Sequence, residues 1–370
     1  MRTYLISLAS MFPGVLIRKY VNMSQSKVTC PRFVSLMTAL ILSGCGGGGG
    51  GGGGSPAPPP PPAVIYSSPV TSVSPPNYTL ADNTTIATQL NTARQATGSG
   101  LLAQNTSLDQ AALSHTNFLV NNQLVGNYSY LTTIVDGVLG AHYENSALPG
   151  YTGALPQDRA TAAGYKGAVT ELLAFGDSSG ASCLDSFEDS VVHLGELISS
   201  FVDIGIEFNA GNGTGSVCAI ELGINSTTLG QLPTAGTVVT FPYDGQTGVP
   251  AVFYNLAESP VIAPDLTIAG HPIMVSLYTM ATQTLSGSDI VIQGFTLTPE
   301  NGATVPVRIY ANTGVTSTGT TVLVDDSIPF TGEVVLLPTM PLISGTVYNV
   351  SFAAKVKGAT VSKSWSFTTG

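Results

Sequence analysis

The chain has 370 residues, only 9% of them are charged, and the net charge is −10 at pH 7. This acidity argues against nucleic acid as a partner, because phosphate binding needs a basic patch and none is visible. At about 150 residues per domain, the length predicts two domains once terminal segments are removed.

The first predicted element is a secretion signal over residues 1–45. Lys27 and Arg32 precede an apolar run that ends at Leu42. The run is shorter than the ~20 residues of a membrane-spanning helix, so we expect secretion. The stretch "LSGC" resembles the lipobox of bacterial lipoproteins, which implies that Cys45 is lipidated. We therefore expect an extracytoplasmic protein that a lipid anchors to a membrane, at the outer membrane, in the periplasm or on the cell surface.

Residues 46–78 are predicted to form a tether. Nine glycines, Gly46 to Gly54, lead into "SPAPPPPPA", so a flexible segment is followed by a stiff polyproline segment. Neither segment has apolar side chains to bury. Such a tether would hold the folded part away from the membrane that the lipid engages.

Residues 79–230 predict helices followed by an antiparallel sheet, which is an α+β domain. The first helix covers "ADNTTIATQLNTARQATG", with Asp82 or Asn83 as its cap and Gly98 as its stop. The second covers "NTSLDQAALSHTNFLVNNQ", where Ser107 and Gln110 are spaced as a capping box.

Two further helices and a hairpin complete this domain. A third helix starts at Pro156, a residue favoured in the first turn. A fourth runs through "DSFEDSVVHLGELISSF", capped by Asp185 or Ser186. The strands "FVDIGIEF" and "SVCAIELGI" are joined by the turn "NAGNGTGS".

Cys183 and Cys218 are the only cysteines in the predicted mature chain. A secreted protein meets an oxidising compartment, so we expect them to form a disulfide. Two buried free thiols are the alternative. A structural zinc site would need more Cys or His close by.

Residues 236–370 predict an all-β domain, because short alternating runs recur between Gly and Pro turns. An immunoglobulin-like β-sandwich fits this pattern best. Trp365, the single tryptophan, is expected in its core, and His271 is expected in a turn.

The order of motifs in the first domain resembles the CAP superfamily, also called SCP-like extracellular proteins. The resemblance is carried by "LNTARQATG", "LDQAALSHTNFLV", "AHYEN", "PQDRATAAGY", "VTELLAFG", "SVVHLGELIS" and "VCAIELG". It implies an α-β-α sandwich with a cleft that holds two His and usually two acidic residues. In some members of the family this cleft binds a divalent metal.

The resemblance also implies site residues. His142 matches the first cleft His, Glu171 the acid of the Gly-Glu-Asn motif, and His193 the second His. His142 and His193 are thus the candidate metal ligands, with zinc as the candidate ion. The fourth, acidic position is assigned to Glu144, with Glu188 as a weaker candidate.

The residues themselves favour a shared cleft for His142 and Glu144. Residues two apart in an extended segment face the same side, and a carboxylate beside an imidazole fixes its tautomer. A surface ion pair is the alternative for this pair. His115 lies on the apolar face of the second helix, so a hydrogen-bonded core role is favoured over a ligand role.

We expect an extracellular binding module, and the resemblance implies a small lipid-like molecule, a cell-wall fragment or a divalent metal as the candidate ligand. No complete catalytic set is identified by spacing, so binding is expected rather than catalysis. A metal-dependent hydrolase of peptide or cell-wall bonds remains open as an alternative. A structural adhesion protein of the envelope is a second alternative.

Overall fold

The computed structural model describes residues 66–370, except residues 136, 214 and 226–228. The predicted signal, the lipobox with Cys45 and most of the predicted tether lie outside the described residues. The last part of that tether contacts the fold. Strand β1 (Tyr66–Ser67) pairs in parallel with β8 (Gly230–Gln231), and the Val70 amide donates to the Gln231 side chain.

The amino-terminal part of the described chain is an α+β module, which confirms the predicted fold class. Its main sheet has the strand order β2-β6-β7-β5, and a two-stranded hairpin, β3-β4, accompanies it. The strands are β2 (Ala103–Gln104), β3 (Ile134–Val135), β4 (Val138–Leu139), β5 (Gly167–Phe175), β6 (Asp203–Asn209) and β7 (Val217–Asn225). The helices are α3 (Ala81–Thr97), α4 (Thr106–Asn121), α5 (Tyr128–Thr132), η2 (Gly140–His142), α6 (Pro156–Ala162), α7 (Gly180–Glu188) and α8 (Val192–Leu197).

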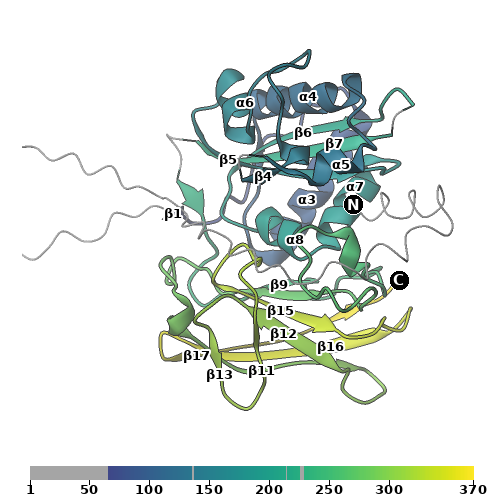
Figure 1. Ribbon diagram of the computed structural model, residues 1–370. Coiled ribbons are helices and arrows are strands. Elements are labelled where there is room, and N and C mark those ends of the chain that lie inside the picture. Colours follow the sequence, from purple (N-terminus) through teal and green to yellow (C-terminus); the bar gives the residue numbers. More distant parts are fainter. Residues whose placement is uncertain (1–65, 136, 214, 226–228) are drawn as a thin grey trace, which may run out of the picture. The chain divides into compact units, whose positions relative to one another are not determined.

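Helices cover both faces of this sheet because its strands are apolar on both sides. Leu172 and Ala174 of β5 share a core cluster with side chains of α3 and α7. Leu173 and Phe175 point the other way and pack with side chains of α4. Figure 1 shows α4 and α6 on one side of β5, β6 and β7, with α3 and α7 on the other. The expected three layers are therefore present.

One predicted helix stop and one predicted helix start are confirmed, whereas the predicted caps of the first two helices are not. Gly98, with a φ of 77°, ends α3, and Pro156 is the first residue of α6, both as predicted. The predicted caps of the first two helices are wrong. Asp82 accepts a hydrogen bond from the Gly180 amide instead, and Asn105 rather than Ser107 caps α4. Asp82 bonds to a residue distant in sequence, whereas α4 is capped by the residue two positions before Ser107.

The predicted fourth helix is two helices. Ser179 caps α7, which ends at Glu188, and α8 begins at Val192 after a break. Asp185 lies inside α7, so its predicted capping role is wrong. Because of this break α8 is a separate short helix, and it carries His193 of the site described below.

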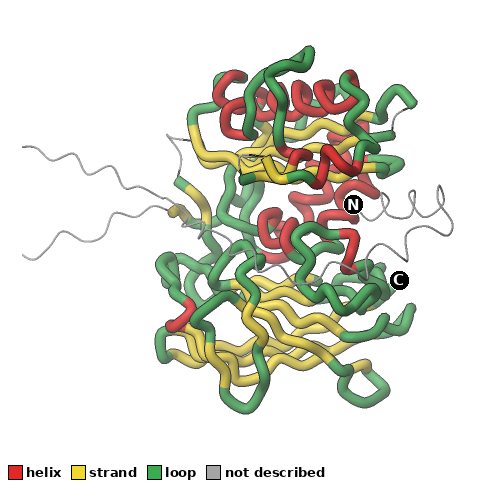
Figure 2. The backbone as a smooth tube through the Cα atoms, in the orientation of Figure 1, coloured by secondary structure: helices red, strands yellow, loops and turns green. Residues whose placement is uncertain are grey.

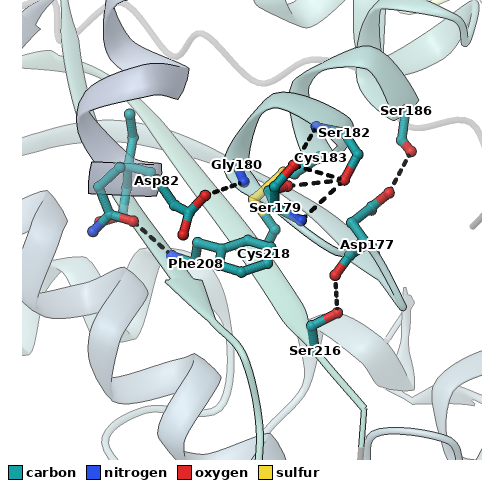
Figure 3. The surroundings of a disulfide bond; sticks show 12 residues. Asp82, Asp177, Ser179, Gly180, Ser182, Cys183, Ser186, Phe208, Ser216 and Cys218 are labelled. Atoms are coloured by element: carbon teal, nitrogen blue, oxygen red, sulfur yellow. Dashed lines mark hydrogen bonds between the residues drawn. A yellow bond between two sulfur atoms is a disulfide. The ribbon is translucent and has the colours of Figure 1, made fainter. Parts of the chain in front are cut away.

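Cys183 and Cys218 form the predicted disulfide. The bond ties α7 to the central strand β7 (Figure 3). Beside it, Asp82 holds the start of α7 against α3. A disulfide of this kind indicates an extracytoplasmic location.

The carboxyl-terminal part is β-rich, as predicted, and Figure 2 shows its strands in yellow. It contains two sheets, with strand orders β14-β12-β15-β10-β9 and β13-β11-β16-β17. The strands are β9 (Val239–Phe241), β10 (Ile273–Ser276), β11 (Ile290–Pro299), β12 (Val307–Ala311), β13 (Thr316–Ser317), β14 (Leu323–Val324), β15 (Glu333–Pro338), β16 (Val347–Val356) and β17 (Ala359–Thr368), with the short helices η3 (Asn255–Ala257) and η4 (Gly287–Asp289).

One apolar core joins these two sheets. Side chains from both contribute, including Val275 of β10, Leu336 of β15 and Phe352 of β16. Trp365 belongs to this core, as predicted, and its indole N–H donates to the Pro242 carbonyl at 2.9 Å.

The outer face of the five-stranded sheet packs on the α+β module. Val191, Leu194 and Ile198, in and beside α8, share a core cluster with Phe241 and Val335. His271, expected in a turn, is buried here with only 1% exposure, and its Nδ1 lies 3.5 Å from Asp189. That expectation is wrong, because the neighbouring module covers the residue. Within the described part of the chain, no helix combines the length and apolarity that crossing a membrane requires.

Candidate functional site

A buried charged network lies between α4, α6 and the sheet. His115 of α4 is fully buried, with its Nδ1 3.0 Å from Glu144 and its Nε2 2.9 Å from the carbonyl oxygen of Ala141. The other oxygen of Glu144 accepts the Thr152 amide at 2.7 Å. His115 therefore has the hydrogen-bonded core role that the sequence favoured.

Glu171 of β5 is the centre of this network. One of its oxygens lies 2.9 Å from Nδ1 of His142, and the other accepts from Arg159 of α6 at 2.7 Å. Burial alone would raise the pKa of Glu171. The charges of Arg159 and His115, with the hydrogen bond to His142, instead hold that pKa well below its usual range. Glu171 is thus held as a carboxylate inside the protein.

A second carboxyl group lies directly across the ladder. Glu221 of β7 is the register partner of Glu171, and it is completely buried. Burial and the negative charge of Glu171 raise the pKa of Glu221 well above its usual range. Arg159 beside one carboxyl group and burial around the other therefore push the two pKa values apart, that of Glu171 downward and that of Glu221 upward.

The network reaches solvent at a small group of half-buried side chains. The side chain of His142 is 23% exposed. Near it, the Thr170 hydroxyl donates to Glu196 of α8 at 3.3 Å. Burial raises the pKa of Glu196, while the charges of His193 and His142 lower it, so Glu196 interacts with both imidazoles. We call His142, Thr170, His193 and Glu196 the cleft residues, after the cleft that the family resemblance implies.

Three neighbouring side chains contact the imidazole ring of His193. Its Nδ1 lies 3.2 Å from the Ser190 hydroxyl and 3.5 Å from Glu258 of the β-rich module. Its ring is tilted against Phe187, with the centroids 5.6 Å apart. A cavity of about 30 Å³ adjoins it, with Phe187, Phe253 and Glu258 among its walls. That volume is enough for an ordered water molecule.

The structure sorts the predicted site residues into two groups. The charges of His142 and His193 both act on the pKa of Glu196. Glu144 and Glu171 are buried behind His142, so the carboxylate that pairs with His142 is Glu171 rather than its near neighbour in sequence. The weaker candidate, Glu188, ends α7, where burial and its acidic neighbours Asp185 and Asp189 raise its pKa to about 8.

Three residues of the site were missed. Glu196 lies three positions after His193 in the same helix, and that spacing could have indicated it. The sequence places Arg159 only within the third predicted helix and indicates no role for it in the site. The pairing of Glu221 with Glu171 depends on strand register, which no local pattern encodes.

The cleft does not offer the donor set of a zinc centre. Among the residues that the structure describes, no three His, Cys, Asp or Glu side chains are grouped so that they could hold a metal ion. Catalytic zinc takes three protein ligands, and structural zinc takes four. The assignment of His142 and His193 as metal ligands stays a prediction.

Comparison with known proteins adds little to this geometry. No protein-family model and no curated protein matches the chain. Among solved structures, an outer surface protein from Borrelia burgdorferi matches with 17% sequence identity and a TM-score of 0.31, and the match covers 40% of this chain and 97% of that chain.

Proposed function

We propose that this chain is a lipid-anchored binding protein of the bacterial envelope. In this proposal Cys45 carries the lipid, the α+β module is a CAP-type module, and the β-rich module is immunoglobulin-like. The ligand binds at the cleft residues. The observation that carries the proposal is His142, whose side chain is 23% exposed and whose Nδ1 lies 2.9 Å from Glu171, a buried carboxylate paired with Arg159.

The free-energy cost of burying these charged side chains supports a functional role for the network. Glu144, Arg159, Glu171 and Glu221 are buried at 6% exposure or less in a chain with few charges. Buried ion pairs seldom stabilise a protein more than apolar packing would. Their arrangement does fix one side chain at the surface. Glu171 accepts from His142 at Nδ1, which leaves Nε2 of that ring as the atom for a ligand.

The chemistry of the cleft favours a polar ligand. Its four side chains supply two imidazoles, a carboxyl group and a hydroxyl group, all half-buried. Such groups bind amides, hydroxyls and amines by hydrogen bonds, whereas an aliphatic chain would leave them unsatisfied. Of the candidate ligands, a peptide-bearing cell-wall fragment fits this set best.

Titration of the protein with a muropeptide, followed through the histidine ring signals by NMR, tests the proposal. We expect the signals of His142 and His193 to shift and that of His115 to stay. The double variant H142N/H193N should weaken binding at least about tenfold, because each hydrogen bond to a charged group contributes about 1.5–3 kcal/mol. Lys166→Gln, an exposed change in the same module, should bind as the wild type does.

The same titration separates the alternatives. Zinc that binds the wild type and not the double variant would replace the cell-wall ligand with a metal. Cleavage of the muropeptide would indicate the hydrolase. Wall material that binds the double variant unchanged would move the function to adhesion elsewhere on the protein. Unchanged histidine signals at saturating muropeptide would end the proposal.

A further inference from the structure

The second cleft histidine lies on a helix that the β-rich module holds at both ends. Glu258 follows η3 in that module, and its carboxylate accepts the amide protons of Val191 and Val192 at 2.9 and 2.5 Å. These amides begin α8, where no carbonyl of the helix can reach them. No side chain of the α+β module caps this helix, so Glu258 does.

The same carboxylate reaches the site. Its Oε1 lies 3.5 Å from Nδ1 of His193, the ring nitrogen that also faces the Ser190 hydroxyl. Glu258 is 4% exposed, so water does not screen the contact strongly. One group thus anchors the start of α8 and fixes the orientation of the imidazole in its first turn.

A second carboxyl group of the β-rich module packs on the following turn. Gly195 lies against Glu333 of β15, and a methyl group at Gly195 would lie 2.7 Å from Oε2 of Glu333 and 2.8 Å from Pro329. A side chain at this position would force Glu333 or Pro329 to shift, so the glycine permits the close approach. Glu333 is itself 1% exposed. Burial, and in addition the charge of Glu196, raises the pKa of Glu333 well above its usual range.

The apolar side of α8 completes the contact. Val191, Leu194 and Ile198 belong to the core cluster that contains Phe253 and Ile262, and not to either of the clusters on the faces of the α+β sheet. The break between α7 and α8 lets the short helix turn its apolar side toward this neighbouring core.

We infer that the β-rich module is part of the ligand site, and that Glu258 is a positioning residue for His193. The cleft is incomplete without this module: α8 would lose its cap, the ring would lose its rear contact, and the apolar side of the helix would face water. This inference deepens the proposed function and rests on it only for the identity of the ligand.

The test compares E258Q with E300Q in the full chain. Gln keeps the size of Glu258 but removes its charge and one of its two acceptor oxygens. Glu300 is an exposed acid of the same module, directly after β11, so E300Q makes the same chemical change away from α8.

The first readout needs no ligand. In E258Q we expect the amides of Val191 and Val192 to exchange with solvent about tenfold faster, because a charge-assisted hydrogen bond is lost. The ring signals of His193 should move, and those of His142 and His115 should not. E300Q should leave all of them in place. A spectrum of E258Q that matches E300Q would overturn the inference.

The second readout measures binding. E258Q should weaken muropeptide binding several-fold by misplacing His193, and E300Q should not. A wild type that does not bind the muropeptide would sink the proposed function alone, since the ligand-free spectra still decide the role of Glu258.

The third readout asks whether the modules unfold together. Trp365 reports on the β-rich core, and helical circular dichroism reports on the α+β module, where all described α-helices lie. We expect both probes to follow one transition in the wild type and in E300Q. Two separate transitions in the wild type would overturn the inference. E258A should separate the transitions, and failure of E258A to fold at all would agree with the same conclusion.

Discussion

At the scale of single residues, the opposed carboxyl groups of Glu171 and Glu221 carry the largest electrostatic consequences. They are register partners on neighbouring strands, and both are buried. Arg159 lies 2.7 Å from Glu171, and this contact selects which member of the pair is ionised. The network therefore separates the pKa values of two neighbouring glutamates.

Stability should respond to pH in opposite ways at these two positions. The pKa of Glu171 is lower in the fold than in the unfolded chain, so its stabilisation is present above about pH 4.3 and is lost as the pH falls through the folded value. The pKa of Glu221 is higher in the fold, so its contribution is present below about pH 4.3 and is lost as the pH rises through the folded value.

The variants E171Q and E221Q test this directly by urea unfolding between about pH 2 and pH 8. E171Q should cost about 3–5 kcal/mol at neutral pH, since it breaks a buried pair and leaves Arg159 uncompensated. Its cost should shrink toward acidic pH. E221Q should unfold at a higher urea concentration relative to the wild type as the pH rises. Parallel pH profiles for both variants and the wild type would contradict the assignment.

At the scale of elements, the approach of α4 to the sheet depends on one glycine. Gly205 of β6 faces the backbone of α4, and a methyl group there would lie 2.1 Å from the carbonyl carbon of Leu108. Because that neighbour is backbone, it cannot move aside as a flexible side chain could. The helix that carries His115 thus lies at a depth that Gly205 sets.

Gly205→Ala should therefore lower the free energy of unfolding by about 1–3 kcal/mol or more, the usual cost of overpacking. Gly294 of β11 is the matched control, because it also lies in a strand but has no atom within 4 Å of an added methyl group. Gly294→Ala should be neutral or slightly stabilising. Equal urea midpoints for the two variants would show that α4 does not press on Gly205.

At the scale of the whole molecule, covalent and apolar links join segments that are distant in sequence. The disulfide joins positions 35 apart. The core beneath α8 joins Ala93 and Val191 to Val335 and Leu337 of the β-rich module. Loss of either link should lower the free energy of unfolding, because each one joins segments that are distant in sequence.

Reduction of the disulfide should lower the free energy of unfolding by about 4 kcal/mol, since a loop of this length gains entropy in the unfolded chain. Urea unfolding with and without reductant measures the loss, and the double variant C183A/C218A should show a similar loss in both conditions. A wild type whose midpoint ignores the reductant would show that the bond does not stabilise the fold.

Much of the fold was predictable because its causes are local. Gly98 and Pro156 set helix boundaries through their own backbone preferences. Cys183 and Cys218 are the only cysteines among the described residues, and they pair with each other. The cap at Asp82 was not predictable, because Gly180, far along the chain, competes for its side chain, and Asp185 is not a cap because α7 begins earlier, after Ser179.

The sequence alone determined the α+β and β-rich classes and the disulfide. Tertiary structure alone decided which carboxyl group serves which histidine, which of two opposed glutamates is ionised, and which module holds α8. The physical reason is the distance along the chain between the residues that determine each feature. Helix ends and strand alternation follow from neighbouring residues, whereas burial, register and charge pairing arise only when distant segments exclude water from one another.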